Sequence, residues 1–351
     1  MTSNLPNRCY TEEMTRRYVR QTTFPPIGTH GQEMIANSKV VVVGCGALGS
    51  CSAEMLVRAG VEKLTLVDRD LVDISNLQRQ CLFTEKDALK GTPKAVAAKR
   101  ALLRINSTSD IEAKVLAIDS HNVESAIGIP DLIIDGSDNF PLRFLINEYA
   151  VKNTIPWIYG ACLSSRGLVI TFLPEAGFCL RCLMGSLPKP GSMETCASSG
   201  IIAPAVHIVS ASQVAMALSV LTKQRPEKLL FEFDVWKGSF RTSQVSPAKL
   251  LPCQVCEEHK FDDLKHSHTP RVERLCGAGT IQLVPPQETE IDYQKIKDRL
   301  DGSVEISENQ YMLRLSLSDC DITLFKDGRS IIRGVSDPLS AQNLYATYIG
   351  Y

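Results

Sequence analysis

The 351-residue sequence has no excess of charge of either sign, and this absence narrows the range of its partners. Its 38 Lys and Arg residues face 39 Asp and Glu residues, so the formal net charge is −1, and no long run of basic residues occurs. Proteins that bind nucleic acid by neutralising phosphates are usually basic. The composition therefore argues against a nucleic-acid partner.

Long hydrophobic runs are missing as well. Residues 1–24 are polar and charged, without the apolar segment that a secretory signal needs. The most apolar long stretch, 201–221, is interrupted by Pro204, His207 and four more polar residues, so nothing approaches the roughly 20 apolar residues of a membrane span. The twelve cysteines of such a chain are more often free thiols or metal ligands than disulfides. We expect a cytoplasmic protein with no membrane partner.

The sequence does show a regular alternation of strands and helices as far as about residue 160. The unbroken β-branched run Val40–Val43 is typical of a parallel strand that is buried on both faces. Further elements follow it: a helix over 50–59, a strand over 64–67, a helix over 93–105, and strands over 111–116 and 131–135. This order predicts an α/β fold with right-handed connections.

The chain changes character after residue 160. We expect a strand over 168–172, a segment rich in Gly, Pro, Ser and Cys over 174–204, a helix over 205–221 and a strand over 229–235. From residue 280 the chain restarts with strands and two helices, over 292–300 and 338–348, and Lys326–Arg329 is a hairpin signal between two short strands. This last region predicts a small, separate α+β module.

Three glycines, Gly44, Gly46 and Gly49, follow the first strand in a GxGxxG pattern and open the next helix. Glycine there lets backbone N–H groups approach an anion at the positive end of the helix. Asp68 lies 19 residues after Gly49, at the end of the next strand, where a carboxylate can accept hydrogen bonds from a ribose. The alternative is a tight turn that binds nothing. We favour a nucleotide site and leave the nucleotide open at this point.

Two cations favour a polyphosphate ligand. Arg79 belongs to a polar segment, 70–80, that is too irregular for a core element, and Lys94 lies in the first turn of a helix, directly after Pro93. A lysine there opposes the helix dipole, a mild cost that makes sense if both face the same anion. Taken alone, Lys94 is more simply a solvated surface lysine. Together, Arg79 and Lys94 suit the triphosphate of ATP better than a dinucleotide.

Asp138 follows the buried strand over 131–135, at the edge where open α/β sheets bind ligands. A carboxylate close to phosphates is suited to holding a magnesium ion. The alternative is a helix N-cap, a role that Asp138 or Asn139 could fill equally well. The sequence alone does not separate the two roles.

Two CxxC pairs, Cys179/Cys182 and Cys253/Cys256, give the most specific local signal. Four thiolates in two such turns form the closed tetrahedral site of a structural zinc ion. We favour zinc over a redox pair or chance. Cys196 stands apart, in a polar loop just ahead of a helix, where a nucleophilic thiol and an incidental free cysteine fit equally well.

Taken together, these motifs resemble the ThiF/MoeB/HesA family of ubiquitin-activating-type adenylyltransferases. The matching strings keep their order from about residue 16 to 257: Arg17–Gln21, the glycine turn, Asp68-x-Asp70, Ser75–Gln80, Gly91-x-Pro93-Lys94, Asp135–Asn139, both CxxC pairs and Thr195-Cys196. The resemblance implies a homodimer whose Rossmann-like, mostly parallel sheet carries an antiparallel extension and a zinc site. It also implies a reaction: with ATP and magnesium, such an enzyme adenylates the C-terminal glycine of a small ubiquitin-like sulfur carrier that ends in Gly-Gly.

The resemblance further implies a role for each matching residue. Asp68 would hold the ribose, Asp138 would be the essential acidic residue, and Arg20 would reach into the active site of the partner subunit. Cys196 matches a cysteine that forms a covalent link with the carrier in part of the family. The residues that would contact the nucleotide are Gly44, Gly46, Gly49, Asp68, Asp70, Asn76, Arg79, Gln80 and Lys94.

These observations divide the chain into an N-terminal helical segment (1–37), an adenylation domain (38–257), a linker (258–279) and a small α+β domain (280–351). The carrier would be ThiS- or MoaD-like and would serve thiamine thiazole or molybdopterin biosynthesis. Two rival functions stay open. One is adenylation of a peptide or small acid, and the other is an NAD-dependent oxidoreductase, which would leave Arg79, Lys94 and the four thiols without a role.

Overall fold

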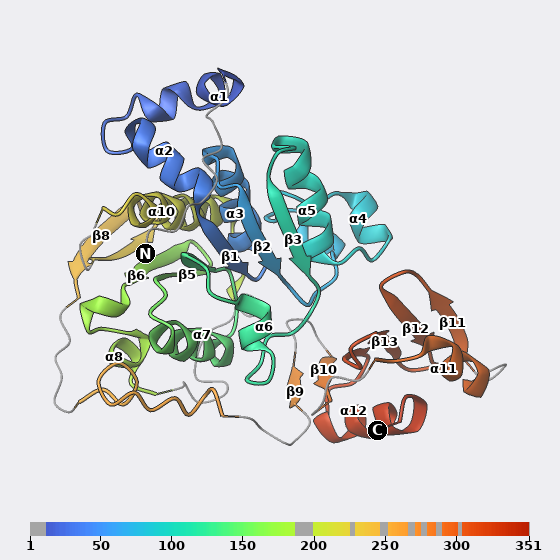
Figure 1. Ribbon diagram of the computed structural model, residues 1–351. Coiled ribbons are helices and arrows are strands. Elements are labelled where there is room, and N and C mark those ends of the chain that lie inside the picture. Colours follow the sequence, from blue (N-terminus) through green and yellow to red (C-terminus); the bar gives the residue numbers. More distant parts are fainter. Residues whose placement is uncertain are drawn as a thin grey trace, which may run out of the picture.

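The computed structural model describes residues 12–186, 199–224, 229–245, 252–265, 271–274, 279–285, 290–300 and 304–350. Its strands form two sheets (Figure 1). The larger sheet has eight strands in the order β3-β2-β1-β4-β5-β6-β7-β8, and the smaller sheet has six in the order β11-β12-β13-β14-β10-β9. The larger sheet belongs to the α/β part of the chain and the smaller one to the C-terminal module.

The first half of the larger sheet is parallel. Its strands are β1 (Lys39–Val43), β2 (Lys63–Val67), β3 (Asp110–Lys114), β4 (Leu132–Asp135) and β5 (Trp157–Leu163). Val43 is level with Val67 on one side and with Asp135 on the other, so the loops that follow these three strands open at the same edge. The chain runs outward from β1 in both directions, which makes this edge the topological switch point where α/β sheets bind ligands.

The second half of the sheet is antiparallel. It consists of β5, β6 (Arg166–Phe172), β7 (Leu229–Asp234) and β8 (Ser239–Gln244). The predicted mostly parallel sheet with an antiparallel extension is therefore confirmed. The strands β5 and β8 lie in segments for which no strand was predicted.

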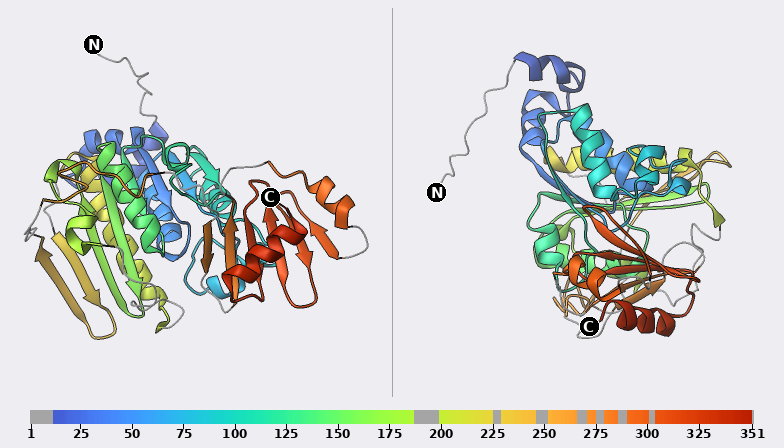
Figure 2. Two further views of the ribbon diagram at one scale, coloured as in Figure 1. Left: turned by 90° about the horizontal axis from the view of Figure 1, so that it is seen from below. Right: turned by 90° about the vertical axis from the view of Figure 1, so that its right-hand side faces the viewer.

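Helices cover both faces of the larger sheet (Figure 2). The helices of the α/β part are α1 (Glu12–Thr22), α2 (Gly28–Asn37), α3 (Ala47–Ala59), α4 (Glu85–Leu89), α5 (Lys94–Ile105), α6 (Val123–Ile127), α7 (Phe140–Lys152), α8 (Leu180–Met184) and α10 (Ala203–Leu221), with short 3-10 turns η1 (Ile74–Asn76) and η2 (Pro174–Ala176). Of these, α1 packs chiefly on α2 rather than on the sheet. Val40 and Val42 pack toward α3, α5 and α10, whereas Val41 and Val43 pack toward α6 and α7. This alternation explains the unbroken valine run, because both faces of β1 are buried.

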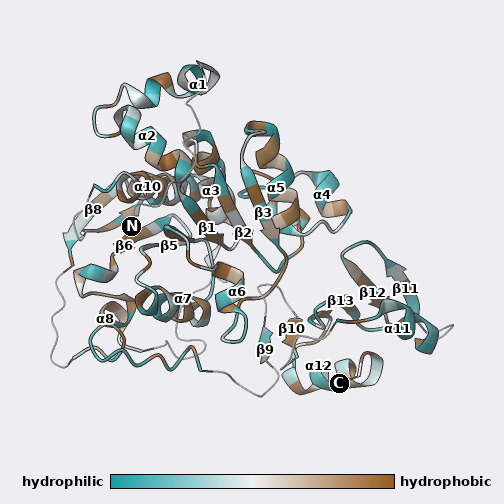
Figure 3. Ribbon diagram, in the orientation of Figure 1, coloured by the Kyte–Doolittle hydropathy of each residue, from teal (hydrophilic) through white to brown (hydrophobic). Residues whose placement is uncertain are grey.

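The long helix α10 is apolar on nearly all sides. Among the described residues it is the one helix with the length and hydropathy to cross a membrane. It packs against α3, β5 and β6, and its side chains join the core of the α/β part. Figure 3 shows the apolar residues concentrated in this region and on the central strands, with hydrophilic residues on outer elements.

The C-terminal module is a six-stranded antiparallel sheet with two helices. Its elements are β9 (Arg271–Arg274), β10 (Thr280–Val284), α11 (Tyr293–Leu300), β11 (Glu305–Glu308), β12 (Met312–Ser316), β13 (Asp321–Phe325), β14 (Ser330–Arg333) and α12 (Pro338–Tyr348). The predicted hairpin joins β13 to β14, and Leu313 and Leu315 of β12 are buried in the core of the module. One expectation was wrong: the linker expected over 258–279 contains β9, which pairs with β10 because it completes the edge of this sheet. The module lies beside the carboxyl ends of β2 and β3 (Figure 1).

Candidate nucleotide-binding site and cysteine cluster

The glycine turn lies between the end of β1 and the start of α3. Gly44 has a φ of +86°, and a Cβ at this position would lie 2.7 Å from the carbonyl oxygen of Gly136. A Cβ on Gly49 would lie 1.7 Å from the Gly44 oxygen, so close packing requires both glycines. Among the described residues, a Cβ on Gly46 would meet only Gln80 Nε2, at 3.9 Å. The packing of the described residues therefore does not require glycine at position 46. The space beside Gly46 leaves room for a ligand at the N-terminus of α3.

Asp68 fixes the shape of this turn. Its carboxylate accepts hydrogen bonds from the backbone N–H groups of Cys45 and Asp70, both at 2.6 Å. Burial raises the pKa of Asp68, and the nearby Lys94 ammonium opposes this rise. The side chain therefore ties the glycine turn to the loop after β2, in the place where the sequence predicted a ribose-binding carboxylate.

Lys94 is buried, not solvated. It is 8% exposed, and its Nζ lies 2.9 Å from Asp70 Oδ2. Burial would lower the pKa of Lys94, but Asp70, Asp68 and Asp138 outweigh burial and raise it. Burial would raise the pKa of Asp70, and Lys94 and Arg69 lower it to about 2. The ion pair is charged at neutral pH, and the alternative of a surface lysine is wrong.

Only part of the predicted polar segment after β2 lies close to the glycine turn. Gln80 is 4% exposed, and its Oε1 has no hydrogen-bond partner among the described residues. Because its Nε2 faces Gly46, Gln80 lies over the glycine turn. Arg79 is half-buried and donates to the Ser75 carbonyl at 2.9 Å. The side-chain oxygen Oδ1 of Asn76 instead accepts a hydrogen bond from the backbone N–H of Asp73, at 3.2 Å, and so forms a capping box with Asp73 at the start of η1.

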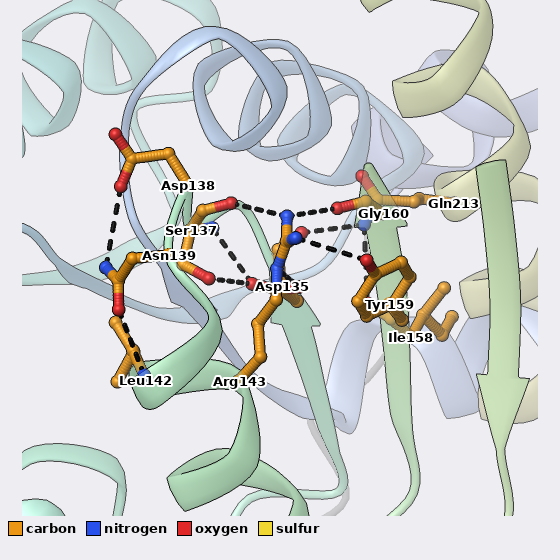
Figure 4. A network of polar contacts seen from close by, with 10 residues as sticks. All are labelled: Asp135, Ser137, Asp138, Asn139, Leu142, Arg143, Ile158, Tyr159, Gly160 and Gln213. Atoms are coloured by element: carbon orange, nitrogen blue, oxygen red, sulfur yellow. Dashed lines mark hydrogen bonds and ion pairs between the residues drawn. The ribbon is translucent and has the colours of Figure 1, made fainter. Parts of the chain in front are cut away.

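The structure separates the two roles that the sequence left open at Asp138. Asn139 is the N-cap of α7, and its side chain accepts from the Leu142 backbone N–H at 3.0 Å (Figure 4). Asp138 is exposed, and its charge contributes to the raised pKa of Lys94 and of Arg69. The helix cap is therefore Asn139, and Asp138 faces the same cluster of charges as Lys94.

Beneath Asp138 lies a buried network that the sequence analysis missed. Arg143 Nε lies 3.1 Å from Asp135 Oδ2, and its other nitrogens donate to the carbonyls of Ser137 and Gly160 and to the Tyr159 hydroxyl (Figure 4). Asp135 is fully buried and also accepts from the Ser137 backbone and hydroxyl. Removing one partner of such a pair typically costs about 3–5 kcal/mol. The network fixes the loop that carries Asp138, and an arginine within the apolar helix 140–152 was the available signal.

Arg20 is not brought to this site. It is exposed on α1, whose Arg17 and Gln21 donate to the carbonyls of Ile105 and Ala59, at the far ends of α5 and α3. Since α3 has 13 residues and begins at the glycine turn, its end lies about 20 Å away from that turn. Within one chain, Arg20 therefore lies at the opposite edge of the sheet.

The two CxxC pairs meet as predicted. The four Sγ atoms of Cys179, Cys182, Cys253 and Cys256 all lie within 4.8 Å of one another. Three of their separations are 3.9, 3.8 and 3.4 Å. A tetrahedral zinc ion with Zn–S bonds of 2.3 Å needs about 3.8 Å between its sulfurs, so the cluster fits this metal. Cys196 lies outside the described residues.

These features define a nucleotide-binding protein of the doubly wound α/β class: a glycine turn at the switch point, a carboxylate after the second strand and a buried lysine beside them. The ThiF family model matches residues 18–255, and the chain belongs to this family. The family resemblance inferred from the sequence is confirmed.

Individual relatives extend the comparison. The sulfur carrier protein ThiS adenylyltransferase of Bacillus subtilis (strain 168) is 40% identical over 338 residues, which cover 96% of this chain and 100% of that protein. The sulfur carrier protein adenylyltransferase of Thermus thermophilus is 36% identical over 76% of this chain and 98% of that protein. The crystal structure of E. coli MccB has a TM-score of 0.60 at 21% identity, covering 71% of this chain and 74% of that one. This structural likeness shows the shared fold.

Proposed function

We propose that this protein is an ATP-dependent adenylyltransferase that activates the C-terminal glycine of a small ubiquitin-like sulfur carrier protein. The observation that carries the proposal is the gathering of Lys94, Asp70 and Asp138 around the glycine turn. Its support from relatives is the 40% identity to a ThiS adenylyltransferase along nearly the whole chain. The relatives named as adenylyltransferases disfavour the rival oxidoreductase.

In the proposed reaction a carboxylate oxygen of the carrier attacks the α-phosphorus of ATP. A bond forms between this oxygen and phosphorus, the bond to the bridging oxygen breaks, and pyrophosphate leaves with the electron pair. Lys94 and Arg79 would donate to the phosphates and stabilise the developing negative charge. Bound magnesium would neutralise phosphate charge, with Asp138 as its carboxylate ligand.

The arrangement of these side chains supports this assignment of residues. Gln80 has a buried oxygen without a partner among the described residues, and Gly46 has room beside it, so both suit a bound nucleotide. Lys94 is held by Asp70 at 2.9 Å. We infer that ATP would share the ammonium with Asp70, since a lysine ammonium has three donors.

The test of the proposed function is carrier-dependent exchange of labelled pyrophosphate into ATP. We expect exchange with a ThiS- or MoaD-like carrier ending in Gly-Gly and none with the same carrier lacking its last glycine. Exchange with peptides or small acids but with no such carrier would favour the rival substrate class. A change in nicotinamide absorbance without exchange would contradict adenylation altogether.

The shared active site of a homodimer is a separate proposal, and it gives a separate prediction. Arg20 is remote from the glycine turn of its own chain, so it can act there only from a partner subunit. Mixing inactive Arg20→Ala chains with inactive Asp138→Ala chains should restore part of the exchange activity, because one hybrid site keeps both wild-type residues. Subunit exchange would be confirmed by native mass spectrometry. Confirmed mixed dimers without recovered activity would contradict the shared site.

Cys196 gives a selective prediction. A thiol close to the adenylated carrier could displace AMP and form a thioester, after which sulfur chemistry would continue on the carrier. Cys196→Ser should therefore leave pyrophosphate exchange intact and lower sulfur transfer to the carrier. Intact-mass analysis under non-reducing conditions would search for a carrier–enzyme adduct that the variant lacks. Persistence of both transfer and adduct in Cys196→Ser would make the thiol incidental.

The remaining proposals concern the setting of this chemistry. We propose a structural zinc ion on the four-cysteine cluster, thiamine thiazole or molybdopterin biosynthesis as the pathway, and a cytoplasmic location. The division into 1–37, 38–257 and a C-terminal domain from about residue 280 also stays a proposal, with β9 assigned to that domain.

A further inference from the structure

Arg329 is a buried cation in the C-terminal module whose guanidinium receives no hydrogen-bond acceptor from the described residues. The residue is 1% exposed, and Nε and both Nη atoms have no hydrogen-bond partner in the described parts of the chain. Asp327 Oδ2 lies 3.7 Å from Nε, and the guanidinium carbon is 3.7 Å from the centroid of the Phe325 ring. These contacts offset part of the positive charge, but they give none of the five N–H donors a hydrogen-bond acceptor among the described residues. Buried donors without acceptors are costly, so the arrangement requires an acceptor from elsewhere.

The hairpin that carries Arg329 is held rigidly by the module. The Arg329 carbonyl accepts from the Phe325 N–H at 2.9 Å, and the Tyr345 hydroxyl of α12 donates to the Gly328 carbonyl at 2.7 Å. The guanidinium therefore cannot reach solvent by a simple movement of the turn.

The β13–β14 hairpin lies against the loop that follows β2, since Arg333 of β14 lies 4.0 Å from Asp73. A second contact joins the C-terminal module to the α/β part of the chain. Arg69, which follows β2 closely, places its Nη1 2.6 Å from Oε2 of Glu273 on β9. Arg329 is one of the cations that lower the pKa of Asp70. Burial lowers the pKa of Arg329 itself, and Asp327, followed by Asp70 and Asp68, opposes this decrease. Arg329 thus belongs to the group of charges that surrounds Lys94.

The carboxylates of that group already have other partners. Asp68 accepts two backbone N–H groups, Asp70 binds Lys94, and Glu273 binds Arg69. Arg329 is buried, as are two of the residues proposed to contact the nucleotide, Lys94 at 8% and Gln80 at 4% exposure. Gln80 also has an unpaired buried oxygen among the described residues. An anion of several oxygens is the acceptor that suits this arrangement.

We propose that Arg329 is a nucleotide-site residue supplied by the C-terminal module, and that its acceptor is a phosphate oxygen of bound ATP. The inference rests on the proposed ATP site and adds a cation from outside the 18–255 region that the family model matches. It gives the module a role in binding.

The test measures the affinity of the full-length protein for MgATP and for adenosine by titration calorimetry. Arg329→Met keeps the length of the side chain and removes its donors, so it should weaken MgATP binding about tenfold or more. Adenosine, which has no phosphate, should bind with unchanged affinity. Arg329→Lys should recover part of the loss.

The matched control is Arg333→Met. Arg333 lies on the same module, 49% exposed and 4.0 Å from Asp73 across the joint, so its loss should change MgATP affinity by less than about twofold. The melting temperature without ligand separates binding from a purely structural role. Because Arg329→Met removes an unpaired buried charge, the melting temperature of this variant should be equal to that of the wild-type protein or higher.

Several results would overturn the inference. They are unchanged MgATP affinity in Arg329→Met, equal losses for MgATP and adenosine, or an equal loss in Arg333→Met. A wild-type protein that binds no ATP would overturn the ATP site together with the role of Arg329. A wild-type protein that binds ATP but exchanges pyrophosphate with no carrier would overturn only the proposed substrate.

Discussion

Lys94→Ala is expected to lower carrier-dependent pyrophosphate exchange by about 10²–10³-fold, the loss typical of one preorganised charge contact in a transition state. Lys94 is buried against Asp70 and surrounded by Asp68 and Asp138, so no solvent cation can replace it at a fixed position. The assay would follow labelled pyrophosphate into ATP at saturating carrier. Lys99→Ala, on the same helix, is the matched control and should keep wild-type activity.

Asp138→Ala is expected to lower exchange by a similar factor without loss of stability. Asp138 is exposed, whereas its neighbour Asn139 caps α7. Asn139→Ala should therefore show the opposite pattern, with stability lower by about 1 kcal/mol and a smaller effect on exchange. Exchange at the wild-type rate in both Lys94→Ala and Asp138→Ala would refute the assigned site.

The second large effect concerns the four-cysteine cluster. Purified protein is expected to contain about one zinc ion per chain, and Cys253→Ser should lose the metal and lower the free energy of unfolding by on the order of 4 kcal/mol or more. Cys253 and Cys179 are buried, and their sulfurs lie 3.8 Å apart, so a lost ligand leaves a closed site incomplete. Elemental analysis and denaturant unfolding provide the measurements.

The control for this prediction is Cys320→Ser. Cys320 is a partly exposed free thiol of the C-terminal module, so its substitution should change neither metal content nor stability markedly. A closed site with four thiolates has no open position for substrate. Folded Cys253→Ser protein should therefore keep normal nucleotide affinity. Metal-free protein with unchanged stability would contradict a structural zinc.

The sequence predicted those parts of the site that depend on local spacing. The glycine turn, Asp68 and the two CxxC pairs are recognisable because each motif has a fixed relation to a strand end or a turn. Lys94 was recognised as a ligand candidate, but its burial was not, because Asp70 approaches it through the fold of the loop after β2. From its position in the first turn of a helix alone, a lysine such as Lys94 is expected to be exposed to solvent.

The features that sequence reasoning missed depend on contacts between distant segments. The Asp135–Arg143 pair needs β4, α7 and β5 together, and Arg143 resembles an ordinary helix residue until Gly160 and Tyr159 surround it. The short strand β9 has no hydrophobic alternation and is defined by its pairing with β10. The contact between Arg69 and Glu273 joins two parts of the chain that local pattern separates.

The four-cysteine cluster also has a consequence for folding. Cys179 and Cys253 are separated by 74 positions, and the chain between them contains α10, β7 and β8. A metal held by all four thiolates would close this loop as a cross-link does, and a covalent cross-link of this span removes chain entropy worth about 4 kcal/mol from the unfolded state. Unlike a disulfide, such a clasp survives in a reducing environment, and it can re-form after each unfolding event without an oxidant. The central helix of the core would then refold within a tethered loop, which shortens its search for the sheet.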